Sequence, residues 1–420
     1  MTRFTPSRSR SKLWQPNDAS LTMKGPVLAA VAISAAAVVL VLSMPRPVLS
    51  HETVTTTVLF DREIVKILNR HCVMCHVEGG PSFPLAAYEE VWLQKRKVSA
   101  AMLARHMPPW AAMPGYGRFA NENAVTLRES QFIVSWMEGL GPKNAGQVFS
   151  NIAAPGGATR AAVRAHVDFG VWQLGQPDLT RELDAVFVEP GRPDDVIRSS
   201  IDLGTNVDLR VRAFEYMPGD RRVVRAAVFT VQETGQWIGS WTPWYGFVKL
   251  SANAAYRLPP GAHIAAEIHY RHTHERVVDR GRIGLFFSDD SSAKSVSDVV
   301  VTARPATDAT RGLGSARRLH GESTVATDTA LLALRPDLVA GLTSVEVAAH
   351  RADGGTDVLL FAKDVPQAWP TPYIFKDPVV VRRGTRLSVT AYVQDASAPS
   401  GGVRVTVSGY PAGPSVRPQR

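Results

Sequence analysis

Both cysteines of this 420-residue chain stand in one short run, and their placement constrains the fold more than any other sequence feature. Cys72 and Cys75 lie three residues apart, and His76 follows directly. A pair committed to such a motif leaves no cysteine for a structural disulfide. On one helical turn both thiols can add to the vinyl groups of a haem, and the histidine then meets the iron from the same side. We therefore expect one covalently attached haem c.

Two other chemistries use a pair of thiols at this spacing. A thioredoxin-like redox pair requires a βαβ setting, and a zinc site requires two further thiolates or well-spaced histidines. The sequence offers neither, and His76 would have no role in either site. The motif therefore favours Cys72 and Cys75 as haem attachment points and His76 as an axial iron ligand.

Three residues are candidates for the second axial ligand. Met107 precedes Pro108-Pro109, and Met113 precedes Pro114, so each thioether lies beside a stiff turn that could hold sulfur over the haem. His106 is the third candidate. A lone methionine more often fills core space than binds iron. The choice has consequences, because Met/His ligation raises the haem potential relative to bis-His ligation.

The N-terminal segment predicts export. Residues 1–50 carry six basic residues against Asp18, a balance of +5, which leaves only +4 for the other 370 residues. This modest excess, without clustered basic and aromatic residues, argues against a nucleic-acid partner. An apolar run at 26–44 follows the basic residues and fits either a cleaved signal peptide or a membrane anchor. Both place residues 51–420 outside the cytoplasm: in the periplasm, secreted, or on the outer face of the cytoplasmic membrane.

Residues 55–145 predict a small all-α domain. Asp61 is positioned to cap a helix with apolar residues at helical spacing, and 87–104 predicts a second helix, acidic at its start and basic later. Thr126-Leu127-Arg128-Glu129 forms a capping box before a third helix that ends near Gly139. Three helices around the attachment motif suit a cytochrome c domain.

The rest of the chain predicts a linker and an all-β region. Residues 146–177 are rich in Gly, Ala and Pro, and short alternating or β-branched runs separated by turn signals follow. We expect antiparallel sandwiches over 178–300 and 301–412. The expected strands include 223–231, 264–270, 283–287, 344–349, 358–362, 387–393 and 403–407.

Further residues around the haem motif carry a family resemblance. They are Ile67-Leu68, Pro81-Ser82-Phe83-Pro84-Leu85, Met107-Pro108-Pro109-Trp110, Leu127, Trp136 and Gly141. With them the region resembles a bacterial haem-binding domain that is usually fused to copper type II, ascorbate-dependent monooxygenase-like domains. The resemblance favours Met107 over Met113 as the distal iron ligand.

The resemblance continues through most of residues 172–410. It is carried by 172–178, 215–224, Leu258-Pro259-Pro260-Gly261, Glu267-Ile268-His269-Tyr270, Asp279, 284–287, 369–373, Pro378 and Gly384-Thr385. These residues are similar to monooxygenases of the peptidylglycine α-hydroxylating type, which implies two jelly-roll-like β-sandwiches.

Most of the copper ligands implied by this resemblance are missing. The His-His pair falls on Arg225 and Ala226, and His269 matches the third ligand of the same copper. The His-x-His of the second copper would fall near 336–339, which holds no histidine, and no methionine follows Met217. We therefore expect no copper, with His269 as a vestigial copper position.

His272-Thr273-His274 has a His-x-His pattern just after His269. On a continued strand, residues 272 and 274 would share one face and 269 the other, so the histidines would not converge. A solvated loop tip is the interpretation we favour, and a single copper or zinc site is the alternative.

Three functions remain open. The first is an electron carrier that exchanges electrons with a periplasmic or membrane redox partner and uses its β region for docking or binding. The second is a divergent single-copper monooxygenase supplied with electrons by its own haem. The third is a structural subunit of a larger redox complex. The sequence contains no G-x-S-x-G, phosphate-binding glycine loop or H-E-x-x-H motif, so we expect an electron carrier or redox subunit rather than an enzyme.

Overall fold

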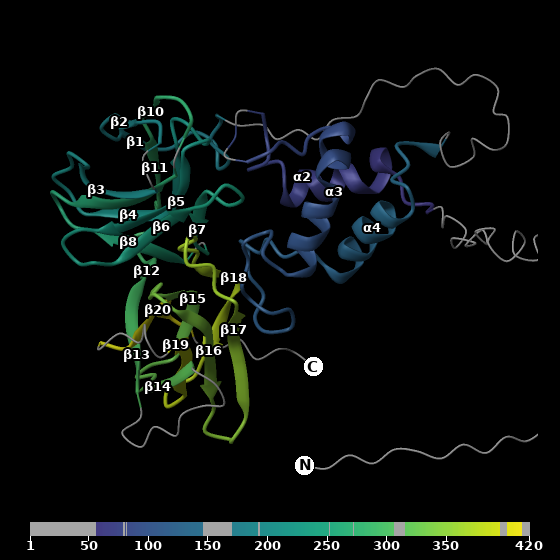
Figure 1. The fold of residues 1–420 in the computed structure, drawn as a ribbon. Helices are drawn as coiled ribbons and strands as arrows, with labels where there is room; N and C mark the ends of the chain where they lie inside the picture. Colours follow the sequence, from purple (N-terminus) through teal and green to yellow (C-terminus); the bar gives the residue numbers. More distant parts are fainter. Residues whose placement is uncertain are drawn as a thin grey trace, which may run out of the picture. The chain divides into compact units, whose positions relative to one another are not determined.

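The computed structural model describes most of the chain beyond residue 55. The described residues are 56–78, 80, 82–145, 170–191, 194–251, 253–271, 273–305, 316–394 and 401–413. The predicted export segment at 1–50, with its apolar run, and most of the linker at 146–177 lie outside these ranges. Within them, no helix has the length and apolar character needed to cross a bilayer. Helical segments come first along the chain and strands follow (Figure 1).

Two of the three predicted helices agree with the prediction in position, and one of them also in capping. α3 (Tyr88–Leu103) follows the predicted range, and α4 (Leu127–Glu138) begins directly after Thr126, the first residue of the predicted capping box. Thr126 Oγ1 accepts a hydrogen bond from the Glu129 amide, and Glu129 Oε2 accepts one from the Thr126 amide. α4 ends at its C-cap, Gly139, as expected.

The first helix begins differently from the prediction. A π-helical turn, η1 (Phe60–Ile64), leads into α2 (Val65–His71), so Asp61 lies inside the first turn and does not cap it. The reason is that other groups satisfy the first amides. Leu59 N–H donates to Glu63 Oε2, and the Phe60 and Asp61 amides donate to the carbonyls of Pro142 and Lys143.

Aromatic residues form the core of the helical region. Trp136 is fully buried, its Nε1 donates to the Pro142 carbonyl, and its ring packs against Phe60, Tyr88 and Trp92. The surrounding buried residues come from η1, α2, α3 and α4. Burial of this cluster stabilises the short helices, which would be marginal alone.

The first β-sandwich contains two sheets and a separate pair of strands. One sheet has the order β1-β11-β4-β8-β12, with β7 on β4, and the other has the order β3-β9-β5-β6. The strands are β1 (Leu179–Glu182), β2 (Val186–Val188), β3 (Asp195–Asp202), β4 (Leu209–Met217), β5 (Val224–Val231), β6 (Trp237–Trp241), β7 (Phe247–Lys249), β8 (Ala254–Leu258), β9 (His263–Tyr270), β10 (Val277–Asp279), β11 (Arg282–Phe287) and β12 (Lys294–Ser295). β2 pairs with β10. Pairing is antiparallel except between β12 and β8.

The second β-sandwich is a single path of strands in the order β17-β16-β19-β14-β13-β20-β15-β18. β13 joins its two halves, because it pairs with β20 along most of its length and with β14 at its end. The strands are β13 (Ser297–Pro305), β14 (Ala316–Thr324), β15 (Thr329–Pro336), β16 (Leu342–His350), β17 (Thr356–Lys363), β18 (Tyr373–Val381), β19 (Arg386–Gln394) and β20 (Val403–Pro411).

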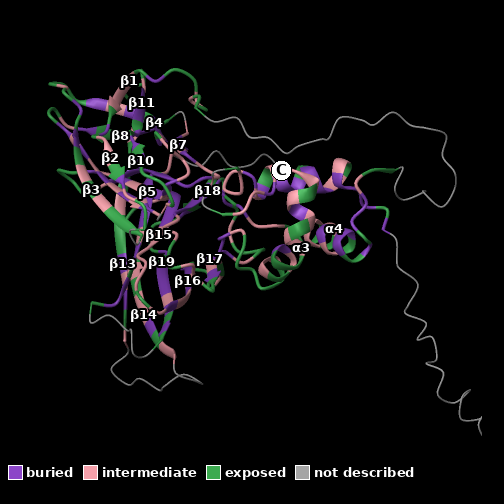
Figure 2. Ribbon diagram, turned by 45° about the horizontal axis from the view of Figure 1, so that its top comes forward, coloured by how far each residue is buried: buried purple, intermediate pink, exposed green. Residues whose placement is uncertain are grey.

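The predicted all-β character of residues 178–412 is confirmed. All seven expected strands are present, and no helix lies among the described residues from 170 to 413. Strand β13 spans the predicted boundary between residues 300 and 301, since it starts at Ser297 and pairs with β20 from there. Buried residues concentrate along the strands (Figure 2).

A segment after α3 packs into the second sandwich. Trp110 and Phe119 belong to the same buried cluster as strand residues of the sandwich, including Tyr373. The Trp110 ring lies 5.3 Å from Tyr373 and 6.0 Å from Phe119. The helical region is therefore joined to the β region by buried apolar contacts as well as by the chain.

Candidate haem site

One further turn of chain after α2 brings the two thiols and the imidazole together. The amides of Cys75 and His76 both donate to the Cys72 carbonyl, at 3.1 and 2.9 Å. This turn places Cys72, Cys75 and His76 on the wall of one pocket. Neither thiol is in a disulfide. Burial is the main cause that raises the pKa of Cys72 to about 12 and of Cys75 to about 11, so both thiols are protonated at neutral pH.

A backbone hydrogen bond fixes the orientation of His76. Its Nδ1 donates to the Phe83 carbonyl at 2.9 Å, and the Phe83 ring lies 5.1 Å from the imidazole. The Leu85 amide donates to the His76 carbonyl, which holds the loop in place. Burial is the main cause that lowers the pKa of His76 and so favours the neutral ring. With Nδ1 protonated and bonded, Nε2 is the nitrogen left for a metal.

The pocket is mostly apolar and partly open to solvent, with a cavity volume of about 120 Å³. Val98, Ala101 and Met102 of α3 line it together with residues of the loops around it. The remaining lining residues are His71, Cys72, Cys75, His76, Ser82, Phe83, Leu85, Lys97, Met107, Pro108, Pro109, Asn123, Val125, Trp244, Arg271 and Trp369. Concave apolar sites with a few convergent polar groups are the usual form of cofactor pockets.

The candidate distal ligands lie in different places. Met107 is on the pocket wall and is 42% exposed, which leaves its thioether accessible. Met113 lines a separate hollow, and its Sδ lies 2.6 Å from Nη1 of Arg105. His106 is exposed and does not line the pocket. Met102 also lines the pocket, although the sequence reasoning did not consider it.

His71 is a buried structural histidine. Its Nδ1 lies 3.0 Å from Asn123 Oδ1, and its Nε2 lies 3.4 Å from the Glu129 carboxylate. Glu129 also belongs to the capping box of α4. Burial raises the pKa of its carboxyl, but the hydrogen bonds from Thr126 and the contact with His71 outweigh burial and leave that pKa below its usual value. Through these contacts His71, the last residue of α2, connects α2 to the loop that contains Asn123 and to the first turn of α4.

The β region supplies part of the pocket wall, which the sequence did not predict. Trp244 precedes β7, Arg271 follows β9 directly, and Trp369 precedes β18. The two indole rings lie 5.5 Å apart, and the Arg271 guanidinium lies 5.7 Å from the Trp369 ring. Trp244 Nε1 donates to the Asn121 carbonyl of the helical region.

The residues present fit a covalently attached haem. Two thiols and an imidazole with its Nε2 available face one pocket, and aromatic and aliphatic side chains form much of its wall. Cys72 and Cys75 would hold the porphyrin through thioether bonds, and His76 would ligate the iron.

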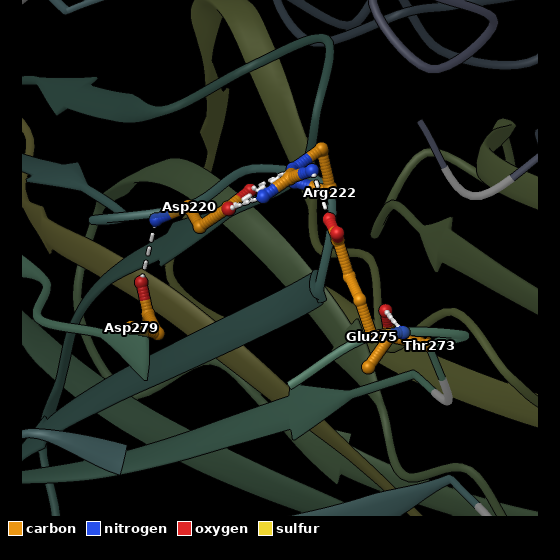
Figure 3. Close-up of polar contacts among 5 residues, drawn as sticks. All are labelled: Asp220, Arg222, Thr273, Glu275 and Asp279. Carbon is orange, nitrogen blue, oxygen red and sulfur yellow. Dashed lines mark hydrogen bonds and ion pairs between the residues drawn. The ribbon is translucent and has the colours of Figure 1, made fainter. Parts of the chain in front are cut away.

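The loops beside Arg271 are fixed by an acid–base network. Asp279, which is buried, accepts hydrogen bonds from the Tyr270 hydroxyl and the Asp220 amide, both at 2.8 Å. Arg222 donates to both oxygens of Asp220 and to Glu275 Oε1 (Figure 3). The network links the loop before β5 to the turn that follows Arg271.

Of the three positions predicted for the first copper, Arg225 and Ala226 are not histidines, and only His269 matches the expected ligand. Ala226 on β5 lies directly opposite His269 on β9. Arg225 forms an ion pair with Asp194, and His269 Nε2 lies 3.0 Å from Glu267 Oε1. The two strands therefore bring together the positions expected from the resemblance, but an alanine methyl group faces His269.

Near the positions expected for the second copper, the described residues include no converging metal ligands. Asp337 Oδ2 accepts a hydrogen bond from Arg404 Nε at 2.7 Å. β9 ends at Tyr270, so the argument from strand faces does not extend to His274, which is exposed in the following turn. His272 lies outside the described residues. Among the residues the structure describes, no group of three His, Cys, Asp or Glu side chains could hold a metal ion.

Comparisons with known proteins leave the function open. No protein-family model matches this chain, and no curated protein matches its sequence. Among solved structures it is similar to a Paenibacillus xanthan lyase (12% identity, 56% of this chain and 26% of that one, TM-score 0.18). It is also similar to PNGF-II (9% identity, 56% of this chain and 66% of that one, TM-score 0.24). A third similar structure is the bacteriophage PM2 major capsid protein P2 (9% identity, 56% of this chain and 99% of that one, TM-score 0.23). The chain spans about a quarter of the lyase and two thirds of PNGF-II. These scores carry no argument about function, and the resemblance stated from the sequence motifs stays a prediction.

Proposed function

We propose that this chain is an exported mono-haem c-type cytochrome that transfers single electrons. The observation that carries the proposal is the hydrogen bond from His76 Nδ1 to the Phe83 carbonyl, which leaves Nε2 for iron beside Cys72 and Cys75. A haem in this site supplies a one-electron Fe(III)/Fe(II) couple. One electron enters from a reduced donor and leaves to an oxidised acceptor, and no covalent bond to a protein residue forms or breaks.

Met107 is the proposed distal ligand, and residues 55–145 are the proposed cytochrome domain. Met107 is supported because its side chain lies on the pocket wall, whereas Met113 lies in another hollow beside Arg105. A thioether ligand raises the potential relative to a second imidazole, which suits a carrier that receives electrons.

The proposed role of the β region is docking or binding without copper chemistry. Two observations support it: Ala226 faces His269, and Arg225 is paired with Asp194. A protonated guanidinium has no lone pair for a metal and repels a cation. The redox partner is expected in the periplasm or at the outer face of the cytoplasmic membrane.

The test is export of the full chain in a bacterial host that attaches haem, followed by metal analysis and a denaturing gel stained for haem. Iron at one equivalent without copper, and a stained band lost in the Cys72→Ser/Cys75→Ser double variant, are the expected results. His76→Ala is the matched control: the thioethers still tether haem, poorly or with an altered spin state. Stained haem on the double variant would overturn the attachment site, and stoichiometric copper would favour the monooxygenase alternative.

A further inference from the structure

Arg271 is a half-buried cation on the wall of the candidate haem pocket. It follows the end of β9, its amide donates to the Val223 carbonyl at 2.9 Å, and its Nη2 donates to the Val224 carbonyl at 3.2 Å. These bonds, with the network around Asp279, fix the residue where the first sandwich meets the pocket. Burial is the main cause that lowers the pKa of Arg271 to about 10, a value at which the side chain stays charged at neutral pH.

The charge of Arg271 has no close anionic partner among the described residues. The nearby carboxylate of Asp194 pairs with Arg225, and no salt bridge of the described part of the chain includes Arg271. Its Nε is buried and finds no hydrogen-bond acceptor there. Burying a guanidinium without an anion is costly, and an unmade hydrogen bond adds to the cost. An anion on the pocket side would offset this cost and give the Arg271 Nε an acceptor.

The ligand expected in the pocket carries suitable anions. A haem bears propionate carboxylates, and a guanidinium matches a carboxylate with charge-assisted, often bidentate hydrogen bonds. Arg271 and Cys75 line the same pocket and are near enough to influence each other electrostatically. A haem attached at Cys75 would thus lie within the surroundings of this guanidinium.

We propose that Arg271 of the first sandwich binds a propionate carboxylate of the haem attached to Cys72 and Cys75. The inference rests on the proposed function, because it needs the haem. The β region then completes the cofactor site that the helical region begins. Pairing with a guanidinium neutralises the carboxylate, which removes negative charge that stabilises ferric iron. Arg271 therefore raises the haem reduction potential.

The experiment compares Arg271→Gln and Arg271→Lys with the parent protein in its exported, haem-loaded form. Arg276→Gln is the matched control, since Arg276 lies in the same loop region but is exposed and pairs with Glu189. Potentiometric titration measures the Fe(III)/Fe(II) equilibrium, and redox-difference infrared spectra follow the propionate carboxylate bands. Haem staining and circular dichroism show whether each variant is loaded and folded.

Arg271→Gln is expected to shift the equilibrium about tenfold toward ferric haem, which is about 59 mV for a one-electron couple. The propionate bands should move in the same variant, Arg271→Lys should recover part of both changes, and Arg276→Gln should alter neither. A folded, loaded Arg271→Gln or Arg271→Lys protein with parental potential and parental propionate bands would overturn the proposal. A parent protein without covalent haem would instead refute the proposed function.

Discussion

Trp110 connects the candidate distal ligand with the core of the second sandwich, so Trp110→Ala is an informative perturbation. The residue lies three positions after Met107, is 5% exposed, and packs edge-on against Phe119 and Tyr373. Removing the indole leaves a cavity between the segment and the sandwich. It also removes the ring contacts by which the segment after Met107 packs against Tyr373 of the sandwich.

The expected loss of stability follows from this burial. Truncating a fully buried Trp or Phe to Ala costs about 3–5 kcal/mol, which combines lost transfer free energy with the cavity left behind. The two edge-on ring contacts of Trp110 account for about 0.5–1.5 kcal/mol each of that total. For a domain of this size such a loss lowers the thermal midpoint on the order of 10 °C.

Thermal and urea unfolding of the exported protein measure this loss of stability. Circular dichroism follows the β region, and haem absorbance follows the pocket. Tyr116→Ala is the matched control. Tyr116 lies in the same segment but is 41% exposed and contacts only Phe361 among the ring pairs of the described residues, so about 1 kcal/mol or less is expected. A Trp110→Ala midpoint within 2 °C of the parent, on the order of the control, would refute the claim that this segment packs into the sandwich core.

Three further predictions test single groups. Met107→Ala should abolish the far-red sulfur-to-iron charge-transfer band of the oxidised haem while Met113→Ala keeps it, and the opposite result would reassign the ligand. Burial raises the pKa of Asp279 above its usual value, so its stabilising contribution is present below pH ~3.9 and is lost as pH rises through the folded pKa. In urea unfolding from pH 3.5 to 7, Asp279→Asn should remove this fall in the free energy of unfolding. If the free energy of unfolding varies with pH in the variant as it does in the parent, the raised pKa of Asp279 is contradicted. Copper titration followed by electron paramagnetic resonance should give no stoichiometric type II signal, and a signal that disappears in His269→Ala would contradict the predicted loss of copper.

Local sequence patterns predicted most helices and strands, because the interactions behind these patterns span only a few residues. The capping box at Thr126 depends on residues within one turn, and its reciprocal bonds with Glu129 form as expected. The expected strands formed because alternation and flanking turns define a half-buried strand without reference to its partners. The prediction that Asp61 caps the first helix was wrong, because the helix starts earlier in the chain. The Leu59 carbonyl accepts hydrogen bonds from the Glu63 and Ile64 amides, which an N-cap at Asp61 would have satisfied.

The pocket could be predicted only in part, because much of its wall comes from distant segments. The attachment motif places its own thiols and imidazole, since their spacing fits one turn of chain. The acceptor for His76, the Phe83 carbonyl, belongs to a nearby loop but has no sequence pattern of its own. Trp244, Arg271 and Trp369 reach the pocket only through the fold of the sandwiches, so no spacing rule relates them to Cys72.

These contributions give the β region a physical role that does not require copper. An apolar pocket favours the less charged ferrous haem, and a nearby guanidinium strengthens that preference. In the proposed function both effects depend in part on side chains of the sandwiches: the Trp244 and Trp369 rings line the pocket, and Arg271 supplies the charge. Arg271 follows β9, the strand that carries His269, so one strand leads both to the predicted copper position and to the haem pocket. With Arg225 and Ala226 at the positions expected for copper ligands, β9 is paired with both β5 and β3. The position of Arg271 after β9 therefore does not need a metal, and under the proposed function the sandwich would tune the haem without binding copper.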